Sequence, residues 1–305
     1  MSFLLGILEQ GLIIAVAALG VYITYSILDF PDLSVDGTFT LGAAVSVVAI
    51  MNDVNPFISL VFAFIAGTLG GLITGILHVK FKITSLLAGI LVMGGLYSIN
   101  LRIMDKANLP IFNEISIFTS NNKLIVILII AIGIKIVMDL IFKTKFGFIL
   151  KATGDNETLV TTLAVSPGKI KIIALMVSNG LVALSGAMMA QYQSFADITM
   201  GIGFVTMALA SIILGQSVFK SERVLKSTTV VIIGAILYKL SIGLAINIGF
   251  KPSDIKLITS LIVFAAIVMN SNKFSINIKK IFKVNSKGIS SNRKGIFKKR
   301  GDLNA

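Results

Sequence analysis

Apolar runs recur along this chain and leave it few ways to fold, because about 20 apolar residues in a helix cross the hydrocarbon core of a membrane. The sequence is 55% apolar and only 13% charged, against roughly a quarter charged in soluble domains. We therefore expect an all-α polytopic membrane protein, with residues 1–270 as its transmembrane domain. About nine membrane segments are expected, two of them short: Leu4–Leu28, Phe39–Met51, Phe57–Leu77, Ile83–Met104, Lys123–Phe142, Ile172–Gln191, Ile202–Gly215, Leu225–Ile246 and Ile255–Met269.

The basic residues predict the orientation of these segments. Cytoplasmic loops carry an excess of Lys and Arg, and most of the 27 such residues lie at 80–82, 143–171, 220–226 and 273–300. All four stretches fall on one side if the N-terminus is outside and the C-terminus inside. The N-terminus has no basic region or cleavage site typical of a signal peptide, so its apolar run is expected to be retained.

The stretch 27–44, ILDFPDLSVDGTFTLGAA, interrupts the apolar pattern with three acidic residues. The apolar run after it, Phe39–Met51, is too short to cross the membrane alone, which indicates a broken or half-length helix. A backbone that breaks at membrane depth must be shielded by protein or line a watery cavity. Two interpretations stay open: a half-helix whose N-terminus, around 36–38, faces a transport route, or an ordinary acidic turn at the membrane surface.

A similar pattern recurs at 192–215, where a polar link containing Asp197 and a glycine precedes a short apolar run. Residues 25–43 and 192–210 align loosely, with Asp32 near Asp197. In internally repeated transporters, such breaks tend to mark the substrate route. Asn100 and Gln191 could hydrogen-bond a substrate or simply join helices. The candidate residues for a substrate path are Phe30, Asp32, Asp36, Thr38, Thr40, Asn100, Gln191 and Asp197.

A polar and basic stretch, residues 143–171, separates two long apolar runs. After a turn at 154–156, Asp155 or Asn156 can accept hydrogen bonds from the first amides of a helix, and Leu159 and Leu163 then fall on one face. We predict a two-turn helix over 157–165 across the cytoplasmic mouth of the membrane domain. The residues leave open a solvated loop or a docking helix for a soluble partner. The residues expected to form this segment are Gly154, Asp155, Asn156, Glu157, Leu159, Leu163, Ala164, Pro167 and Gly168.

Several classes of function are disfavoured by what the sequence lacks. It has no cysteine and one histidine, so we expect no thiol nucleophile and no metal site built from Cys or His ligands. No GxxxxGK[ST] phosphate loop is present, so ATP is expected to bind elsewhere. Ion-coupled transporters place unpaired acids within their spans, whereas Asp139 stands four residues from Lys135 and is expected to pair with it. Glycines at 67–71 and 94–95 allow close helix contacts and need no further function.

Three sequence stretches carry a resemblance to a known family. The runs ATGDN and AVSPGK, followed by LMVSNGLVALSGAMMAQY, resemble the cytoplasmic coupling segment of ABC importer permeases of the branched-chain amino acid and ribose type. GIGFVTMALASIILGQSVF is similar to their late portion, although Gln216 replaces a usual glycine. DFPDLSVDGTFTLGAAV is similar to the tryptophan/tyrosine subgroup. The resemblance covers nearly all of residues 1–270.

The resemblance implies a permease in a bacterial cell membrane, with two copies forming the pore and with no catalytic residue or metal site of its own. It implies that a separate ABC ATPase subunit binds ATP and magnesium, that the helix at 154–168 fits into a cleft on that subunit, and that a substrate-binding lipoprotein delivers the solute. An aromatic amino acid is the expected substrate. Branched-chain amino acids, ribose or nucleosides are the alternatives, and an ion-coupled secondary transporter is a more distant one.

The tail, residues 271–305, has ten basic residues against one acidic residue, Asp302. We expect a disordered cytoplasmic tether, and weak attraction to anionic membrane lipids is the functional alternative. No aromatic side chains are interleaved with its cations for stacking on bases, so nucleic-acid binding is not expected.

Overall fold

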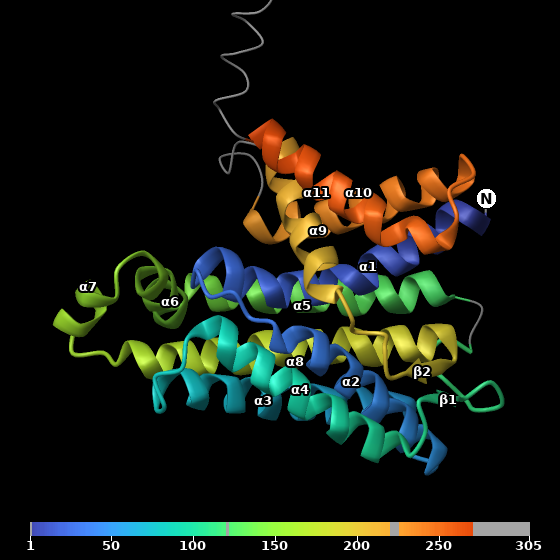
Figure 1. The fold of residues 1–305 in the computed structure, drawn as a ribbon, viewed down its shortest axis with the longest axis horizontal. Coiled ribbons are helices and arrows are strands. Elements are labelled where there is room, and N and C mark those ends of the chain that lie inside the picture. Colours follow the sequence, from blue (N-terminus) through green and yellow to red (C-terminus); the bar gives the residue numbers. More distant parts are fainter. Residues whose placement is uncertain (1, 120–121, 220–225, 271–305) are drawn as a thin grey trace, which may run out of the picture.

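The computed structural model describes residues 2–119, 122–219 and 226–270, and this part of the chain is largely helical (Figure 1). The predicted basic tail lies outside the described residues. The elements are α1 (Ser2–Tyr22), the π-helical turn η1 (Ile23–Ile27), α2 (Ser34–Met51), α3 (Pro56–Val79), α4 (Ser85–Met104), β1 (Asn108–Pro110), α5 (Lys123–Lys143), α6 (Lys145–Asp155), α7 (Glu157–Thr162), α8 (Pro167–Gln193), β2 (Phe195–Asp197), α9 (Phe204–Val218), α10 (Ser227–Asn247), η2 (Pro252–Asp254) and α11 (Ile255–Asn270).

Seven helices of the described chain are long and apolar enough to cross a membrane. They are α1 with η1, α2, α3, α4, α5, α8 and α10, and α9 and α11 are shorter apolar helices. The expected all-α polytopic membrane fold is confirmed. The number of nine membrane segments remains a prediction.

The helix expected over 39–51 is longer than predicted. α2 begins at Ser34 and has 18 residues, so the non-helical break covers only residues 28–33. The carboxylate of Asp32 accepts a hydrogen bond from the Ser34 amide at 2.8 Å, which satisfies one of the free donors at the helix start. The sequence prediction placed the helix start no earlier than residue 36, because residues 34–38 are largely polar. In the structure Ser34 and Asp36 both lie in the first turn of α2, and Ser34 is fully buried.

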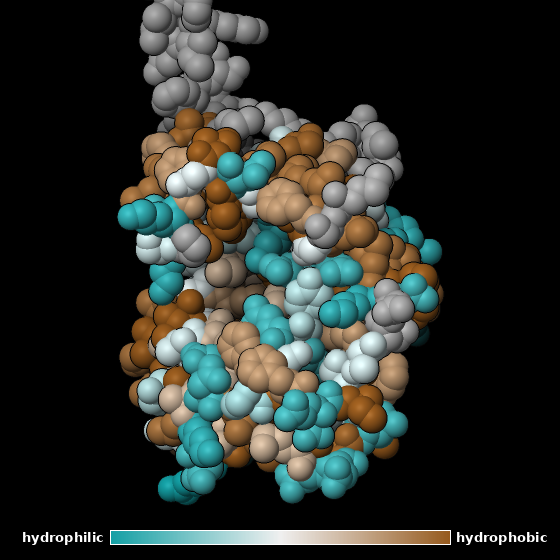
Figure 2. All heavy atoms as spheres, turned by 90° about the vertical axis from the view of Figure 1, so that its right-hand side faces the viewer, coloured by the Kyte–Doolittle hydropathy of each residue, from teal (hydrophilic) through white to brown (hydrophobic). Residues whose placement is uncertain are grey.

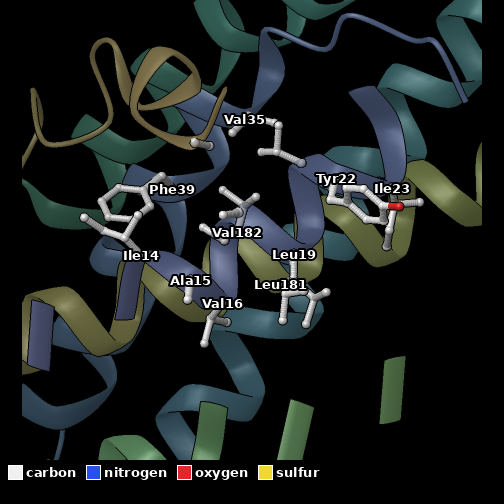
Figure 3. Close-up of a cluster of buried hydrophobic side chains, with 14 of the residues drawn as sticks. Ile14, Ala15, Val16, Leu19, Tyr22, Ile23, Val35, Phe39, Leu181 and Val182 are labelled. Atoms are coloured by element: carbon white, nitrogen blue, oxygen red, sulfur yellow. The ribbon is translucent and has the colours of Figure 1, made fainter. Parts of the chain in front are cut away.

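α1, α2 and α8 form the centre of the protein. Their apolar side chains meet in a buried cluster, in which Ile14 of α1 lies beside Phe39 of α2 and Leu19 of α1 lies beside Leu181 of α8 (Figure 3). Hydroxyl groups of α8 also bind the backbone of α1: Ser185 Oγ donates to the Ile13 carbonyl at 2.7 Å. Because this core joins helices far apart in the sequence, it fixes the position of the break between α1 and α2.

Glycines bring α3 directly against α8. A Cβ atom on Gly71 would lie 2.2 Å from the Leu175 carbonyl oxygen, so only glycine permits this spacing. The glycines at 67–71 are therefore used for the close contact that they allow. Those at 94–95 are not used in this way within the described chain, since a Cβ on Gly94 or Gly95 would meet nothing within 4 Å.

The two ends of the helix bundle differ. α6 and α7 lie at one end, and the N-terminus lies at the other end with β1 and β2 (Figure 1). β1 pairs antiparallel with β2, with Leu109 opposite Ala196. This separation is the one that an outside N-terminus and a cytoplasmic 143–171 segment require.

Candidate functional site

The two interruptions of the helical pattern meet at Asp36. This residue lies in the first turn of α2. Its carboxylate accepts hydrogen bonds from the amides of Gly203 and Val205, both at 2.8 Å, where α9 begins. Gly201 packs so closely that a Cβ there would lie 1.9 Å from the Asp36 carbonyl oxygen. One carboxylate therefore satisfies free amides of a second helix, as an N-cap does, and joins the N-termini of α2 and α9.

A buried polar cluster holds the break at 28–33 against α8. One Asp32 oxygen accepts from the Ser34 hydroxyl at 2.6 Å, and the other accepts from Asn179 Nδ2 at 2.8 Å. The Asn179 oxygen in turn accepts from the Thr38 hydroxyl at 2.7 Å. All four residues are buried. Asp32 and Thr38, predicted for the substrate path, are thus occupied by contacts within the protein.

Three of the predicted path residues line one cavity beside this cluster. Asp36, Thr40 and Asn100 border a space of about 390 Å³ between the start of α2, α4 and the link before α9, a size within the ~300–1,000 Å³ of small-molecule sites. The other lining residues are Gly37, Met93, Gly94, Tyr97, Ile198 and Ile202. Its wall is mainly apolar with a few polar groups, which is typical of a site for a small organic ligand.

Two further candidates lie outside this cavity. Phe30 is buried, with its ring edge-on to His78 at a centroid distance of 4.9 Å. Gln191 is also buried, and its amide nitrogen donates to Ser46 and Ser59 at 3.0 Å. Gln191 therefore joins α8 to α2 and α3. Of the two roles considered for it, substrate contact or a link between helices, the structure shows the link.

Asp197 borders a second cavity, of about 330 Å³, on the other side of the 198–203 link. Lys239 borders it too, and its ammonium donates to Gln10 Oε1 at 3.0 Å. The loose repeat of the sequence has a local counterpart here. Asp197 accepts from both the amide and the hydroxyl of Thr199, as Asp32 does from Ser34. The face that carries β1, β2 and the N-terminus is hollowed near mid-height, with hydrophilic side chains beside the hollow (Figure 2).

The second candidate site is the 143–171 segment. The predicted turn at 154–156 is wrong for Gly154 and Asp155, which complete helix α6. Asn156 is confirmed as the helix cap, since its side chain accepts from the Leu159 amide at 3.2 Å. The helix itself, α7, ends at Thr162 rather than at 165, because Ala164 takes a left-handed conformation with φ 57°.

α7, together with Leu163 directly after its last residue, shows an apolar face to its surroundings. Leu159 and Leu163 are 52% and 61% exposed, whereas Val160 between them is buried. Glu157 pairs with Lys171 on α8, and Pro167 occupies the first turn of α8. Gly168 packs against Val79 of α3. A short helix fixed to the membrane helices by one face, with exposed leucines on another, can receive a partner.

α6 connects this segment to the interior. A Cβ on Gly154 would lie 1.7 Å from the Ile27 carbonyl oxygen, so the α6 backbone directly touches the end of η1. The chain enters the 28–33 break immediately after this point. The contact of Gly154 with Ile27 therefore connects the segment that carries α7 to the 28–33 break, which contains Asp32.

Sequence reasoning missed α6, Asn179 and Tyr97. Asn179 could have been found, because an amide within the apolar run of α8 is costly in a membrane without a partner. Tyr97 gave no signal, since one tyrosine in an apolar helix fits any membrane protein. The expected Lys135–Asp139 pair is confirmed at 2.9 Å, and Lys226 and Thr228 of the α10 region also bind this carboxylate.

Comparison with known proteins gives consistent results for nearly the whole chain. The family model described as "Branched-chain amino acid transport system / permease component" matches residues 3–269. A "Tyrosine transport system permease protein" from Clostridioides difficile is 44% identical over 291 residues, which cover 94% of this chain and 99% of that protein. The "Ribose import permease protein RbsC" of Haemophilus influenzae is 26% identical over 70% of this chain and 68% of its own.

A solved structure shares the fold. "PsaBC from Streptococcus pneumoniae in complex with Fab" aligns with a TM-score of 0.57 and 14% sequence identity, covering 92% of this chain and 96% of that one. At this identity the likeness concerns the fold alone.

Proposed function

Because the chain belongs to the family of branched-chain amino acid transport permease components, we propose that it forms the membrane pathway of an ATP-driven importer for an aromatic amino acid, tyrosine or tryptophan. Two copies enclose the pathway, a substrate-binding protein delivers the solute outside, and an ATPase subunit works at the cytoplasmic end. The similarity to a tyrosine transport permease supports the choice of substrate. The protein itself is a multi-pass permease of the cell membrane.

The observation that carries the coupling part of this proposal is the exposed face of α7. Leu159 and Leu163 leave apolar surface uncovered at the end where α6 and α7 lie. A cleft on the ATPase would cover this surface. Closure of the two ATPase subunits would then press on α7, and α6 would pass the movement to η1 through the contact of Gly154 with Ile27. Packed helices respond to such a push as rigid bodies that switch between two arrangements.

Substitution of both leucines tests the docking role. Leu159→Asp with Leu163→Asp should abolish co-purification of the ATPase, because two buried charges at an interface cost more than its apolar contacts provide. A matched control replaces two exposed apolar residues at the opposite end, Phe112→Asp with Ile115→Asp, and should retain the ATPase. Full co-purification and uptake in the leucine variant would remove α7 from the coupling role.

Uptake by the complete transporter tests the substrate. Proteoliposomes that contain the permease, its ATPase and its binding protein should accumulate labelled tyrosine. This uptake should require ATP on the side of the membrane where the ATPase lies. Unlabelled tryptophan and tyrosine should compete, whereas leucine and ribose should not. ATP-dependent uptake of labelled leucine or ribose, with no uptake of labelled tyrosine, would assign the protein to one of the other substrate classes of its family.

A further inference from the structure

Asn100 carries an unused hydrogen-bond acceptor beside the cavity between α2 and α4. Its amide nitrogen donates to the Gly37 carbonyl at 3.1 Å. A carbonyl only accepts hydrogen bonds, so this contact fixes which end of the amide is nitrogen. The remaining atom, Oδ1, is buried and has no hydrogen-bond partner among the described residues. A buried acceptor without a partner destabilises the protein, so this oxygen favours a ligand that donates a hydrogen bond to it.

The charge of the cavity favours a positive ligand group. Asp36 is the only charged residue among the described residues that line it. Each Asp36 oxygen already accepts one backbone amide, and a carboxylate oxygen can accept further hydrogen bonds. An ammonium group offers several donors and a positive charge, so it matches both Asp36 and the free oxygen of Asn100.

The remaining wall favours a ring. Tyr97 is 50% exposed in the described chain, and Met93, Ile198 and Ile202 add apolar surface. Aromatic rings stack well on each other, and methionine sulfur makes favourable contacts with ring edges. A sugar would bring hydroxyl donors for Asn100 but would leave this apolar wall and the Asp36 charge without matching groups.

We propose that this cavity is a binding site for an aromatic amino acid, whose ammonium group binds Asn100 Oδ1 and the Asp36 carboxylate while its ring packs against Tyr97. The inference rests on the proposed transport function and adds the residues that recognise the substrate. Asn100 and Tyr97 lie one turn apart on α4, so a single helix presents both the acceptor and the ring contact.

The chain offers a matched pair of positions for a protection experiment. It contains no cysteine, so a single introduced thiol is unique in the permease. Gly94 lines the cavity and Gly95 does not, and a side chain at either position meets nothing within 4 Å. In the complete transporter, tyrosine or tryptophan should slow thiol labelling of Gly94→Cys, roughly tenfold at about ten times Kd, and leave Gly95→Cys unchanged.

The chemistry of recognition is tested by changing the ligand and the site. The deaminated analogue of tyrosine, which keeps the ring and the carboxylate, should protect Gly94→Cys weakly. Asn100→Ala in the Gly94→Cys background should raise the protecting tyrosine concentration about tenfold, as loss of one hydrogen bond to a charged group does. Unchanged labelling of Gly95→Cys with Asn100→Ala verifies that the fold is intact. Tyr97→Leu, at an exposed position, should weaken protection and Tyr97→Phe should retain it.

Three results would overturn the inference. They are equal protection by the deaminated analogue, protection that neither Asn100→Ala nor Tyr97→Leu changes, and the absence of protection in a transporter that takes up tyrosine. The proposed function fails in a different way, through absence of ATP-dependent tyrosine uptake in the same proteoliposomes. Uptake of tyrosine without protection of Gly94→Cys would reject the binding site alone.

Discussion

At the scale of single residues, Asp32 and Asn179 determine how the break between α1 and α2 is held. The Asp32 carboxylate has only acceptors, and both of its oxygens face donors, on Ser34 and on Asn179. The Asn179 amide uses its oxygen for Thr38 and its nitrogen for Asp32. Each acceptor in this cluster faces a donor, so replacing one carboxylate oxygen with an amide nitrogen should destabilise the protein.

Asp32→Asn is therefore expected to destabilise the protein by about 1–3 kcal/mol, because the new amide nitrogen faces a donor. The double variant Asp32→Asn with Asn179→Asp reverses the direction of the hydrogen bond between residues 32 and 179, and it should recover part of the lost stability. Recovery is incomplete, since Asn179 Nδ2 also donates to the Leu175 carbonyl at 3.1 Å. Thermal unfolding of the purified permease in detergent measures this cycle, and strictly additive losses would contradict the pairing.

Asp197, at the end that carries β2, predicts a dependence on pH. Burial acts to raise the pKa of its carboxyl, but hydrogen bonds from Thr199 and Asn108 outweigh it and hold the pKa below the ordinary 3.8. A lowered pKa stabilises the fold above pH 3.8, and this contribution is lost as the pH falls through the folded-state pKa.

Asp197→Asn should therefore unfold at a lower temperature than the natural protein at neutral pH, with a difference that shrinks toward strongly acidic pH. Unfolding curves of the two proteins across this range provide the comparison. A difference that stays constant with pH would show that the charge of Asp197 has no part in stability.

At the scale of elements, the contact of α6 with η1 is the structural link between α7 and the membrane interior. Gly154→Ala places a methyl group where only 1.7 Å separates it from the Ile27 carbonyl oxygen, so α6 must move away. We expect the variant to retain the ATPase but to lose most uptake per ATP hydrolysed. Gly133→Ala on α5, where a Cβ meets nothing within 4 Å, is the matched control. Normal uptake by Gly154→Ala would mean that movement reaches the interior by another route.

The elements also show how far the sequence could be interpreted without a structure. Apolar length predicted the membrane helices, and capping chemistry predicted Asn156 at the start of α7. The start of α2 was misplaced, because a polar first turn looks like a loop unless its buried partner on α8 is known. α6 was missed for a similar reason, since Gly147 and Gly154 indicate a turn in isolation but serve close packing in the fold.

The candidate site depended even more on contacts between distant segments. Asp36, Thr40 and Asn100 were identified as polar residues near membrane spans, and the structure brings them to one cavity. Asp32 and Gln191 carried the same signal, yet each is used in helix packing. Composition and spacing cannot separate these cases, because the difference lies in which helix faces which residue.

At the scale of the whole molecule, the proposed orientation places α6 and α7 in the cytoplasm and the β1–β2 end outside. Single cysteines at Phe112 and Phe148, both exposed, can be labelled in intact cells with a thiol reagent that does not cross membranes. Phe112→Cys should react at once, and Phe148→Cys should react only after the cells are made permeable. The opposite pattern would reverse the orientation and remove α7 from contact with an internal ATPase.

The carboxylate of Asp36 has a consequence for how such a molecule can move. It holds the amides of Gly203 and Val205, and sliding α9 along α2 would leave a charge and two amides without partners in a medium that offers none. The Asp36 carboxylate therefore holds the N-termini of the two helices together. We expect α2 and α9 to move as one rigid body during each transport cycle. Bending should be confined to segments in which no hydrogen bond to a charged group has to break.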